Sequence, residues 1–229
     1  MIRAVSYNIH SGRDLFWRKR LDQMAASFQE WNADVICLQE VHQNSKYGYQ
    51  ARFLADQLRY QFLFAPSIQI ADGFYGNAIL TRLACTRFQT VFLPAKKEKR
   101  TLLQASLVWQ GREFLVWNTH CSLQATSRSS QLQLLRTLAR QEQETPLLLF
   151  GDFNAPNITF APLLRDCAWE LGKESLPTLP AFRRRLDYIF ASPHWQVHDF
   201  TLSNIAWSDH VPVIAELDWR ERPHPVPVK

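Results

Sequence analysis

A polar or ionisable side chain stands at one end of each of several short apolar runs. These residues are Asn8, Glu40, His120, Asp152 with Asn154, Asp187, and Asp209 with His210. Such groups are unfavourable beside a core unless they are paired or bind a metal. Taken singly, each has a plain structural explanation as a turn residue, a cap or a satisfied histidine. Strand ends in α/β proteins converge on one edge of a sheet, so together these residues predict one polar site.

The chemistry of these side chains favours one class of reaction. Carboxylate and amide oxygens are hard ligands that suit Mg²⁺ or Mn²⁺, whereas zinc would ask for more His or Cys at defined spacing. The two histidines and the remaining carboxylates are left to orient water and to meet the negative charge of a phosphate. The chain has no G-x-S-x-G, G-x-x-x-x-G-K-[ST] or G-x-G-x-x-G motif, which disfavours acyl transfer, P-loop NTPase and Rossmann dehydrogenase functions.

The elements that must position this site are mostly strands. Short apolar or alternating runs predict strands at 2–7, 35–39, 61–64, 78–81, 87–93, 102–109, 113–119, 147–150, 188–191, 197–202 and 213–217. Helical spacing of apolar residues predicts helices at 20–32, 51–58 and 127–143, with a weaker pattern at 161–168.

Many strands with few helices between them argue against a simple alternating βα fold. We expect an α/β four-layer sandwich, in which two mixed, mostly antiparallel sheets pack face to face and helices flank them. The run at 147–150 is apolar on both faces and should be buried on both. One domain is expected over residues 1–220, followed by a proline-rich tail at 221–229 that cannot form a central strand.

Composition places the chain among ordinary globular proteins of modest positive charge. Lys and Arg number 26 against 21 Asp and Glu, a formal net charge of +5, which favours polyanionic partners. The basic clusters at 18–20, 96–100 and 183–185 are each expected on a solvated surface. The absence of a signal segment or a long apolar run predicts a cytoplasmic location without membrane insertion. We also expect a monomer. The cysteines, at 37, 85, 121 and 167, are not expected to form a disulfide.

In this order, the motifs resemble the endonuclease/exonuclease/phosphatase superfamily, in the form of its small bacterial members. That superfamily includes DNase I-like nucleases, abasic-site endonucleases, neutral sphingomyelinases, inositol-polyphosphate 5-phosphatases and deadenylases. The matching segments span nearly the whole chain, and the L-Q-E, G-D-F-N and S-D-H pieces carry most of the likeness. The segments are 6–10, 36–41, 76–82, 118–120, 151–154, 185–189 and 208–213.

The resemblance implies a role for each motif residue. Glu40 would be the principal ligand of Mg²⁺ or Mn²⁺, with Asn8 and Asp209 completing the metal site directly or through water. Asp152 would orient or deprotonate the attacking water, and Asn154 would hold the scissile phosphate. His210 would contact a phosphate oxygen, with Asp187 fixing its ring. His120 would be a second phosphate contact; which of Asp152, His120 and His210 acts as acid or base stays open.

Two further residues are candidates by position alone. Asn77 lies in the G-N-A segment and is either a support of the site or a turn residue before a strand. Arg128 lies eight residues beyond His120 at the start of a predicted helix. It would reach phosphate or lie on the surface.

The substrate is less determined than the chemistry. We expect a nucleic acid, because the segment 13–20 interleaves Leu15, Phe16 and Trp17 with basic residues and 96–100 is basic. A first alternative is a phospholipid headgroup or a small phosphate ester, with Phe16 and Trp17 dipping into a membrane interface. A second is a catalytically silent binding module, which would have no need of the full set of polar residues.

Overall fold

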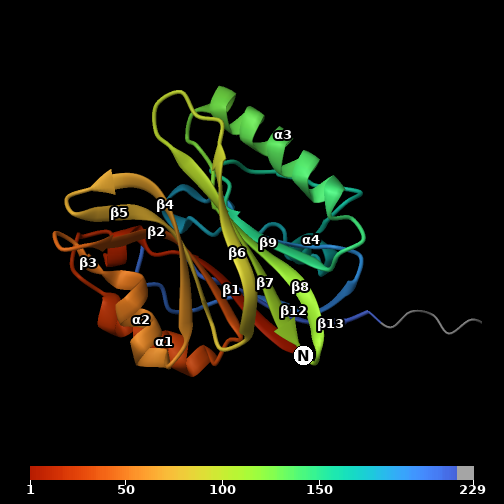
Figure 1. Ribbon diagram of the computed structural model, residues 1–229, viewed down its shortest axis with the longest axis horizontal. Coiled ribbons are helices and arrows are strands. Elements are labelled where there is room, and N and C mark those ends of the chain that lie inside the picture. Colours follow the sequence, from red (N-terminus) through yellow and green to blue (C-terminus); the bar gives the residue numbers. More distant parts are fainter. Residues whose placement is uncertain (221–229) are drawn as a thin grey trace, which may run out of the picture.

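The computed structural model describes residues 1–220, and two β-sheets form its centre (Figure 1). The first sheet has seven strands, of which β3 (Gly48–Tyr49) pairs with β2 at the side. Its other strands follow the order β12 (Trp195–Leu202), β13 (Val213–Trp219), β1 (Ile2–Asn8), β2 (Val35–Asn44), β5 (Gly73–Thr81) and β4 (Gln61–Ile70).

The second sheet has six strands. They follow the order β10 (Arg165–Asp166), β11 (Asp187–Ala191), β9 (Leu147–Asp152), β8 (Arg112–His120), β7 (Arg100–Trp109) and β6 (Ala84–Leu93). Both sheets are mixed, because β1 pairs with β2 and β8 pairs with β9 in parallel, whereas the other pairings are antiparallel.

Helices α1 (Leu21–Trp31), α2 (Gln50–Leu58) and α3 (Ala125–Gln141) cover the outer faces of the two sheets. The short helix α4 (Cys167–Glu170) instead packs on β10, β11 and β12, and its buried residues join the cluster between the sheets. Two 3-10 turns lie at His10–Gly12 and Pro180–Phe182. Figure 1 shows α1 and α2 on one side of the molecule and α3 on the other. Within residues 1–220, no helix is both long and apolar enough to cross a bilayer.

Three apolar clusters hold these layers together. Met24 and Phe28 of α1 pack with Leu54 of α2 on the outer face of the first sheet, and Leu135 of α3 packs on the outer face of the second. A third cluster lies between the sheets. Burial of this apolar area is the main stabilising contribution to such a fold. The four-layer sandwich expected from the sequence is therefore confirmed.

Strand β9 illustrates how the layers are encoded. Leu148 and Phe150 face the other sheet, whereas Leu147 and Leu149 face α3, and all four are buried. Successive side chains of a strand point to opposite faces, so a run that is apolar at every position must be covered on both sides. The prediction for residues 147–150 is confirmed, and the same strand carries Asp152 at its end.

The weak helical pattern at 161–168 was wrong. Phe160 and Leu164 form an isolated bridge, β10 follows at Arg165–Asp166, and the short helix α4 begins only at Cys167. The Asp166 carboxylate accepts a hydrogen bond from the Ala168 N–H at 3.0 Å and so caps the helix at that point. The other predicted helices begin and end within two residues of the expected positions.

Two of the basic clusters are not fully solvated as expected. Arg100 is 5% exposed, and the Arg185 side chain is 9% exposed and forms a two-pronged pair with Asp166. Arg18, by contrast, keeps 63% of its side chain exposed. All four cysteines are free, and Cys37 is a core residue of the inter-sheet cluster. The predicted tail at 221–229 lies outside the described residues.

Candidate active site

Strand register brings the predicted site residues to one edge of the sandwich. In the first sheet Asn8 ends β1 opposite Gln39 of β2, so that Glu40 follows directly. In the second, His120 lies opposite Asp152, and Asp152 in turn lies opposite Asp187 at the start of β11. Parallel strands carry their carboxyl ends to the same edge, which explains why residues distant in sequence meet. We call these residues, with Asp209 and His210 before β13, the strand-end cluster.

Close backbone approach also shapes this edge. A side chain at Gly151 would place its Cβ 2.2 Å from the Thr119 carbonyl oxygen of the neighbouring parallel strand. Only glycine therefore allows β8 and β9 to pair right up to His120 and Asp152.

Glu40 occupies an irregular position of β2. The pairing of β2 with β5 shifts register between Leu38 and Val41, and Glu40 has a φ of 60°. A bulge of this kind redirects a side chain out of the normal alternation. The Asn8 amide Nδ2 donates to Glu40 Oε1 at 3.1 Å, and Asn8 Oδ1 accepts the His10 N–H at 3.0 Å. Asn8 thus orients the Glu40 carboxylate from an almost fully buried position.

Asp152 lies at the centre of the cluster. Its Oδ2 is 3.1 Å from Asn8 Nδ2, 3.5 Å from His120 Nε2 and 3.7 Å from His210 Nε2. Burial and the nearby Asp187 carboxylate raise the pKa of Asp152 to about 7, although His210 acts in the opposite direction. Such a carboxyl group can exchange a proton near neutral pH.

His210 is paired with the second buried carboxylate. Its Nδ1 lies 2.8 Å from Asp187 Oδ2. Burial alone would lower the pKa of His210, but Asp187 and then Asp152 and Asp209 outweigh it and raise the pKa to about 10. His210 is therefore an imidazolium at neutral pH. Thr178 supports this pair, since its hydroxyl accepts the Asp187 N–H at 3.1 Å.

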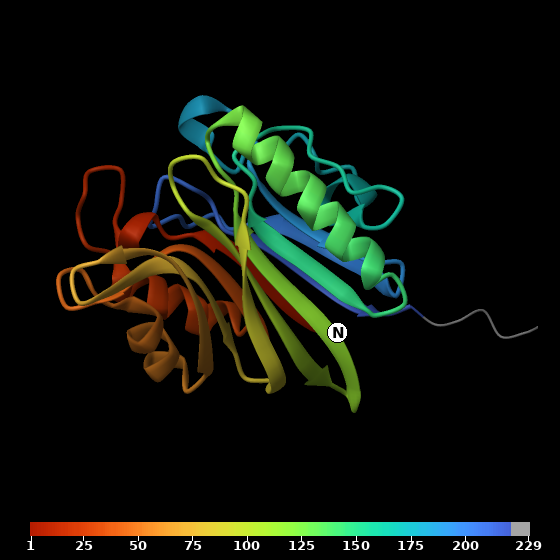
Figure 2. The same ribbon diagram turned by 45° about the horizontal axis from the view of Figure 1, so that its top comes forward.

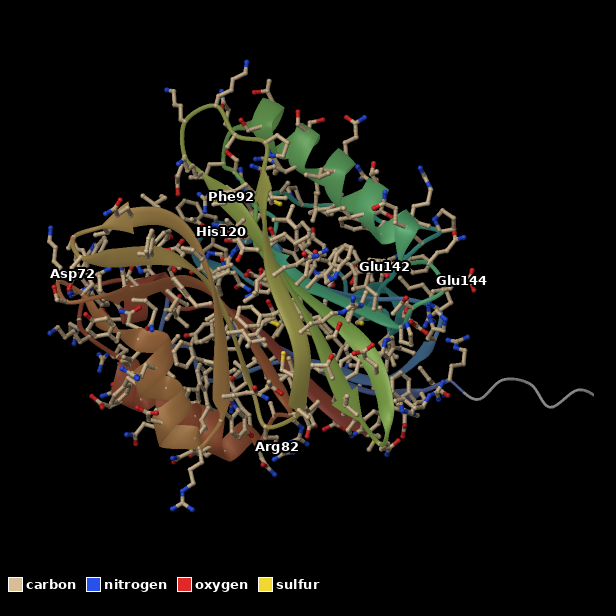
Figure 3. All side chains as sticks on the ribbon, in the orientation of Figure 1. Asp72, Arg82, Phe92, His120, Glu142 and Glu144 are labelled. Carbon is tan, nitrogen blue, oxygen red and sulfur yellow. The ribbon has the colours of Figure 1, made fainter. Side chains whose placement is uncertain are left out.

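His120 has the opposite electrostatic character. Burial, the Arg100 guanidinium and the positive His210 hold the pKa of His120 well below its usual range, so its ring is neutral. Its Nε2 lies 2.9 Å from Asn154 Nδ2, which also donates to the Cys121 carbonyl. Figure 3 shows His120 well inside the outline of the molecule, unlike the labelled Asp72 and Glu144.

Two groups of residues could hold a cation. Within residues 1–220, only Asp152, Asp187 and His210 form a triplet of His, Cys, Asp or Glu whose ligand atoms all lie within 4.8 Å of one another. A charged imidazolium repels a cation, however, and the Asp187 carboxylate is already paired with His210. Glu40 and Asp209 are less buried, and Asp209 keeps a quarter of its side chain exposed. Mg²⁺ retains several waters and needs only one or two carboxylates, so the oxygen donors of Glu40 and Asp209 also suit it chemically.

Asn77 and Arg128 lie outside the strand-end cluster. Asn77 is buried and donates through Nδ2 to the Thr101 carbonyl at 2.9 Å, which ties β5 to β7. Arg128 donates to the carbonyls of Ser122 and Leu123, both at 2.8 Å, and so holds the loop that follows His120.

Several residues near the site were not singled out from the sequence. Arg100 was assigned to a surface cluster, although its electrostatic effect reaches His120. Tyr75 also lies near the site, because burial and the neighbouring Glu40 carboxylate raise its pKa. His42 lies two residues beyond Glu40 and stacks on Tyr47 at 4.4 Å between ring centroids. A basic residue that opens an apolar strand, as Arg100 does before residues 101–108, is the one sequence feature that pointed to burial.

Comparisons with known proteins agree with this architecture. The family model described as "Endonuclease/Exonuclease/phosphatase family" matches residues 5–210. No curated protein matches.

Solved structures share the fold at low sequence identity. An endonuclease/exonuclease/phosphatase from Beutenbergia cavernae is 22% identical, with a TM-score of 0.78, 95% of this chain covered and 71% of that one. The mannosyl-6-phosphatase Bt3783 of Bacteroides thetaiotaomicron is 19% identical (TM-score 0.75, coverage 96% and 100%). TDP2 of D. rerio, complexed with a single-strand DNA product, is 17% identical (TM-score 0.75, coverage 95% and 98%).

A family model that spans nearly the whole chain, together with a strand-end cluster on a four-layer sandwich, leads to one assignment. This chain belongs to the endonuclease/exonuclease/phosphatase family, a family of phosphate-ester hydrolases.

Proposed function

We propose that this protein is a Mg²⁺-dependent phosphodiesterase that hydrolyses nucleic acid with an activated water. The observation that carries the proposal is the setting of Asp152, a buried carboxylate with a pKa of about 7 between the amide of Asn8 and the rings of His120 and His210. A proton acceptor beside the protonated His210 suits in-line attack of water on a phosphate.

The metal would be held by Glu40 and Asp209, with Asn8 keeping the Glu40 carboxylate in place. When bound, the ion would neutralise a nonbridging phosphate oxygen and the charge that develops on the leaving group. The donor set is made of hard oxygens, and Asp209 Oδ1 is already fixed by the Ser208 hydroxyl at 3.0 Å. Mn²⁺ would suit the same ligands.

The remaining residues would handle protons and phosphate. Asp152 would accept a proton from the attacking water, because its raised pKa matches the working pH. The imidazolium of His210, held by Asp187, would donate to a phosphate oxygen. Asn154 would donate through Nδ2 to the same phosphate, and the neutral His120, whose Nε2 accepts a hydrogen bond from Asn154 Nδ2, would hold that amide in place.

Nucleic acid is the substrate that the surroundings favour. The cluster lies beside basic segments at 13–20 and 96–100, in which Lys96, Lys97 and Lys99 are exposed, and such side chains bind a phosphate backbone. TDP2, a structural neighbour, holds a single-strand DNA product. Another neighbour is a mannosyl-6-phosphatase, so hydrolysis of a small phosphate ester is the second candidate.

One set of incubations separates the candidates. The protein is mixed with plasmid DNA, RNA, a phosphodiester chromogen, mixed phospholipids and a sugar phosphate, each with Mg²⁺ and with chelator. We expect cleavage of nucleic acid and chromogen that disappears with chelator and in Glu40→Ala. Headgroup release without nicking, or phosphate release from the sugar phosphate alone, would replace the nuclease proposal. No metal-dependent turnover on any substrate would indicate a silent binding module.

A further inference from the structure

The loop at residues 13–20, which we call the aromatic loop, is exposed at its tip but firmly held at its base. Leu15, Phe16 and Trp17 are 57%, 74% and 64% exposed. Figure 2 shows this N-terminal segment standing away from the sandwich before α1. Large exposed aromatic side chains on a protruding loop are unfavourable for folding alone and typically mark a binding surface.

Asp14 organises the loop. Its Oδ1 accepts the N–H groups of Phe16 and Arg18, at 2.9 and 3.0 Å, and its Oδ2 pairs with the Arg20 guanidinium at 2.9 Å. The backbones at Arg13 and Lys19 bridge the two arms. The tip is therefore ordered before any ligand arrives, which reduces the entropy lost on binding.

Each ring at the tip already has a partner within the protein. The Arg18 guanidinium lies over the Phe16 ring, 4.9 Å from its centroid. The His10 ring packs against Trp17, with 5.0 Å between centroids. Both rings are thus supported from within the protein while more than half of each residue stays exposed. We call the exposed faces of Phe16 and Trp17 the shelf, because another flat group can stack on them.

Contacts connect this shelf directly to the strand-end cluster. The His10 ring that supports Trp17 also lies 3.8 Å from Asp209 Oδ1 through its Nδ1. The His10 backbone N–H donates to Asn8 Oδ1. A group stacked on Trp17 would therefore lie next to the strand-end cluster.

The charge around the shelf identifies the ligand. Arg18 and Lys19 are exposed beside the rings, and these cations complement a polyphosphate strand. We propose that the aromatic loop stacks an unpaired base of a single-stranded polynucleotide, adjacent to the phosphate that is cleaved. This inference rests on the proposed function of the strand-end cluster.

A duplex and a membrane fit the loop less well. Bases in a duplex are already stacked on each other, and a wedge between them contacts bases on both of its faces. One face of Phe16 is already covered by the Arg18 guanidinium. Insertion of the tip into lipid would strip water from the Arg18 guanidinium that covers Phe16, which is unfavourable. A single strand offers both an open base face and phosphates for the cations.

The test measures binding without cleavage. Fluorescence anisotropy of labelled oligo(dT) and oligo(U) is recorded in chelator for the wild type, Phe16→Ala/Trp17→Ala and Trp17→Phe. Trp169→Ala is the matched control, because Trp169 is 70% exposed on α4, which packs on β10, β11 and β12. We expect the double variant to bind at least about tenfold more weakly, Trp17→Phe to retain most affinity and Trp169→Ala to match the wild type.

Two results would overturn the inference. One is equal binding of single strands by the wild type and the double variant. The other is a loss confined to duplex DNA or to phosphatidylserine-containing vesicles, measured in parallel. Mg²⁺-dependent hydrolysis of the phosphodiester chromogen by the wild type tests the proposed function separately, so its failure is distinguishable from failure of the aromatic loop.

Discussion

Most side chains of the strand-end cluster are buried and hydrogen-bonded to one another, whereas those at the tip of the aromatic loop are exposed. Asn8, Asp152 and Asp187 are about 1% exposed; Asn8 donates to Asp152 across the two sheets, and Asp187 pairs with His210. Phe16 and Trp17 are mostly exposed, although the loop that carries them is ordered by one carboxylate. Buried polar groups must satisfy one another and so tolerate little change.

This difference suggests a division between reaction and substrate. The buried cluster has few ways to vary without losing its hydrogen bonds, which suits a reaction shared across a family. An exposed loop can change its tip without disturbing the sandwich, which suits a choice of substrate. Substitutions in the two regions should therefore affect different kinetic constants.

The largest effect is expected from Asp152→Asn. The amide cannot accept a proton, and its size is nearly that of the carboxylate, so the fold should persist. We expect kcat on the chromogen and on nucleic acid to fall about 10³-fold or more. Asp56→Asn, an exposed carboxylate on α2, is the matched control and should stay within about twofold of the wild type. A similar kcat in both variants would show that Asp152 does not take part in the reaction.

Asp187→Asn should have the next largest effect, about 10- to 100-fold on kcat, because Asp187 acts through His210. NMR titration of the His210 ring in metal-free protein measures its pKa, which would not change if Asp187 had a purely structural role. The wild-type ring should stay protonated up to about pH 10, and the variant ring should lose its proton at lower pH. An unchanged titration would contradict the assigned pairing.

The same pair predicts how stability varies with pH. The folded-state pKa of His210 is raised to about 10 from 6.5, so its contribution is complete below about pH 6.5 and is lost as pH rises to about 10. In metal-free protein the unfolding midpoint of the wild type should therefore decline over this range more steeply than that of His210→Gln. Parallel curves for the two proteins would show that His210 is not selectively stabilised as a cation.

A smaller effect is expected from Asp14→Ala, which removes the organiser of the aromatic loop but leaves both rings. KM for an oligonucleotide should rise a few-fold, because the loop then loses entropy on binding, while kcat should change little. A fall in kcat without a change in KM would place the loop in the reaction itself and would weaken the proposed division.

The smallest effect on activity is expected from Asn77→Ala. Its buried amide ties β5 to β7 through the Thr101 carbonyl, so the variant should lose about 1–3 kcal/mol of unfolding free energy in a urea titration. Activity well below the unfolding midpoint should change only a few-fold. A large loss of kcat at full stability would instead make Asn77 a direct participant.

Much of the fold could be predicted because the spacing of apolar residues along the chain reflects which faces of a strand or helix are buried. The run at 147–150 is apolar on both faces and lies between α3 and the other sheet. The residues that follow such runs could be grouped into one site because strand ends share an edge. Helix 161–168 failed because Asp166 caps a helix that begins later, a local contact that apolar spacing does not report.

Other features depend on contacts that no short segment contains. Glu40 is turned by a bulge against β5, and the surroundings of Arg100 include His120, twenty residues away. The shelf at the aromatic loop needs a φ of 60° at Trp17 and the ring of His10. The sequence identifies Glu40, Arg100 and Trp17 as acidic, basic and aromatic, but it does not show which groups surround them in the folded protein.

Calorimetric titration of Mn²⁺ into the wild type, Glu40→Ala and Asp187→Asn tests most directly where the cation binds. Glu40 and Asp209 are the proposed holders, whereas Asp187 is proposed to serve His210. We predict a binding event that weakens at least about tenfold in Glu40→Ala and persists in Asp187→Asn. Binding that is indifferent to Glu40 but lost in Asp187→Asn would place the ion among Asp152, Asp187 and His210 and would contradict the account.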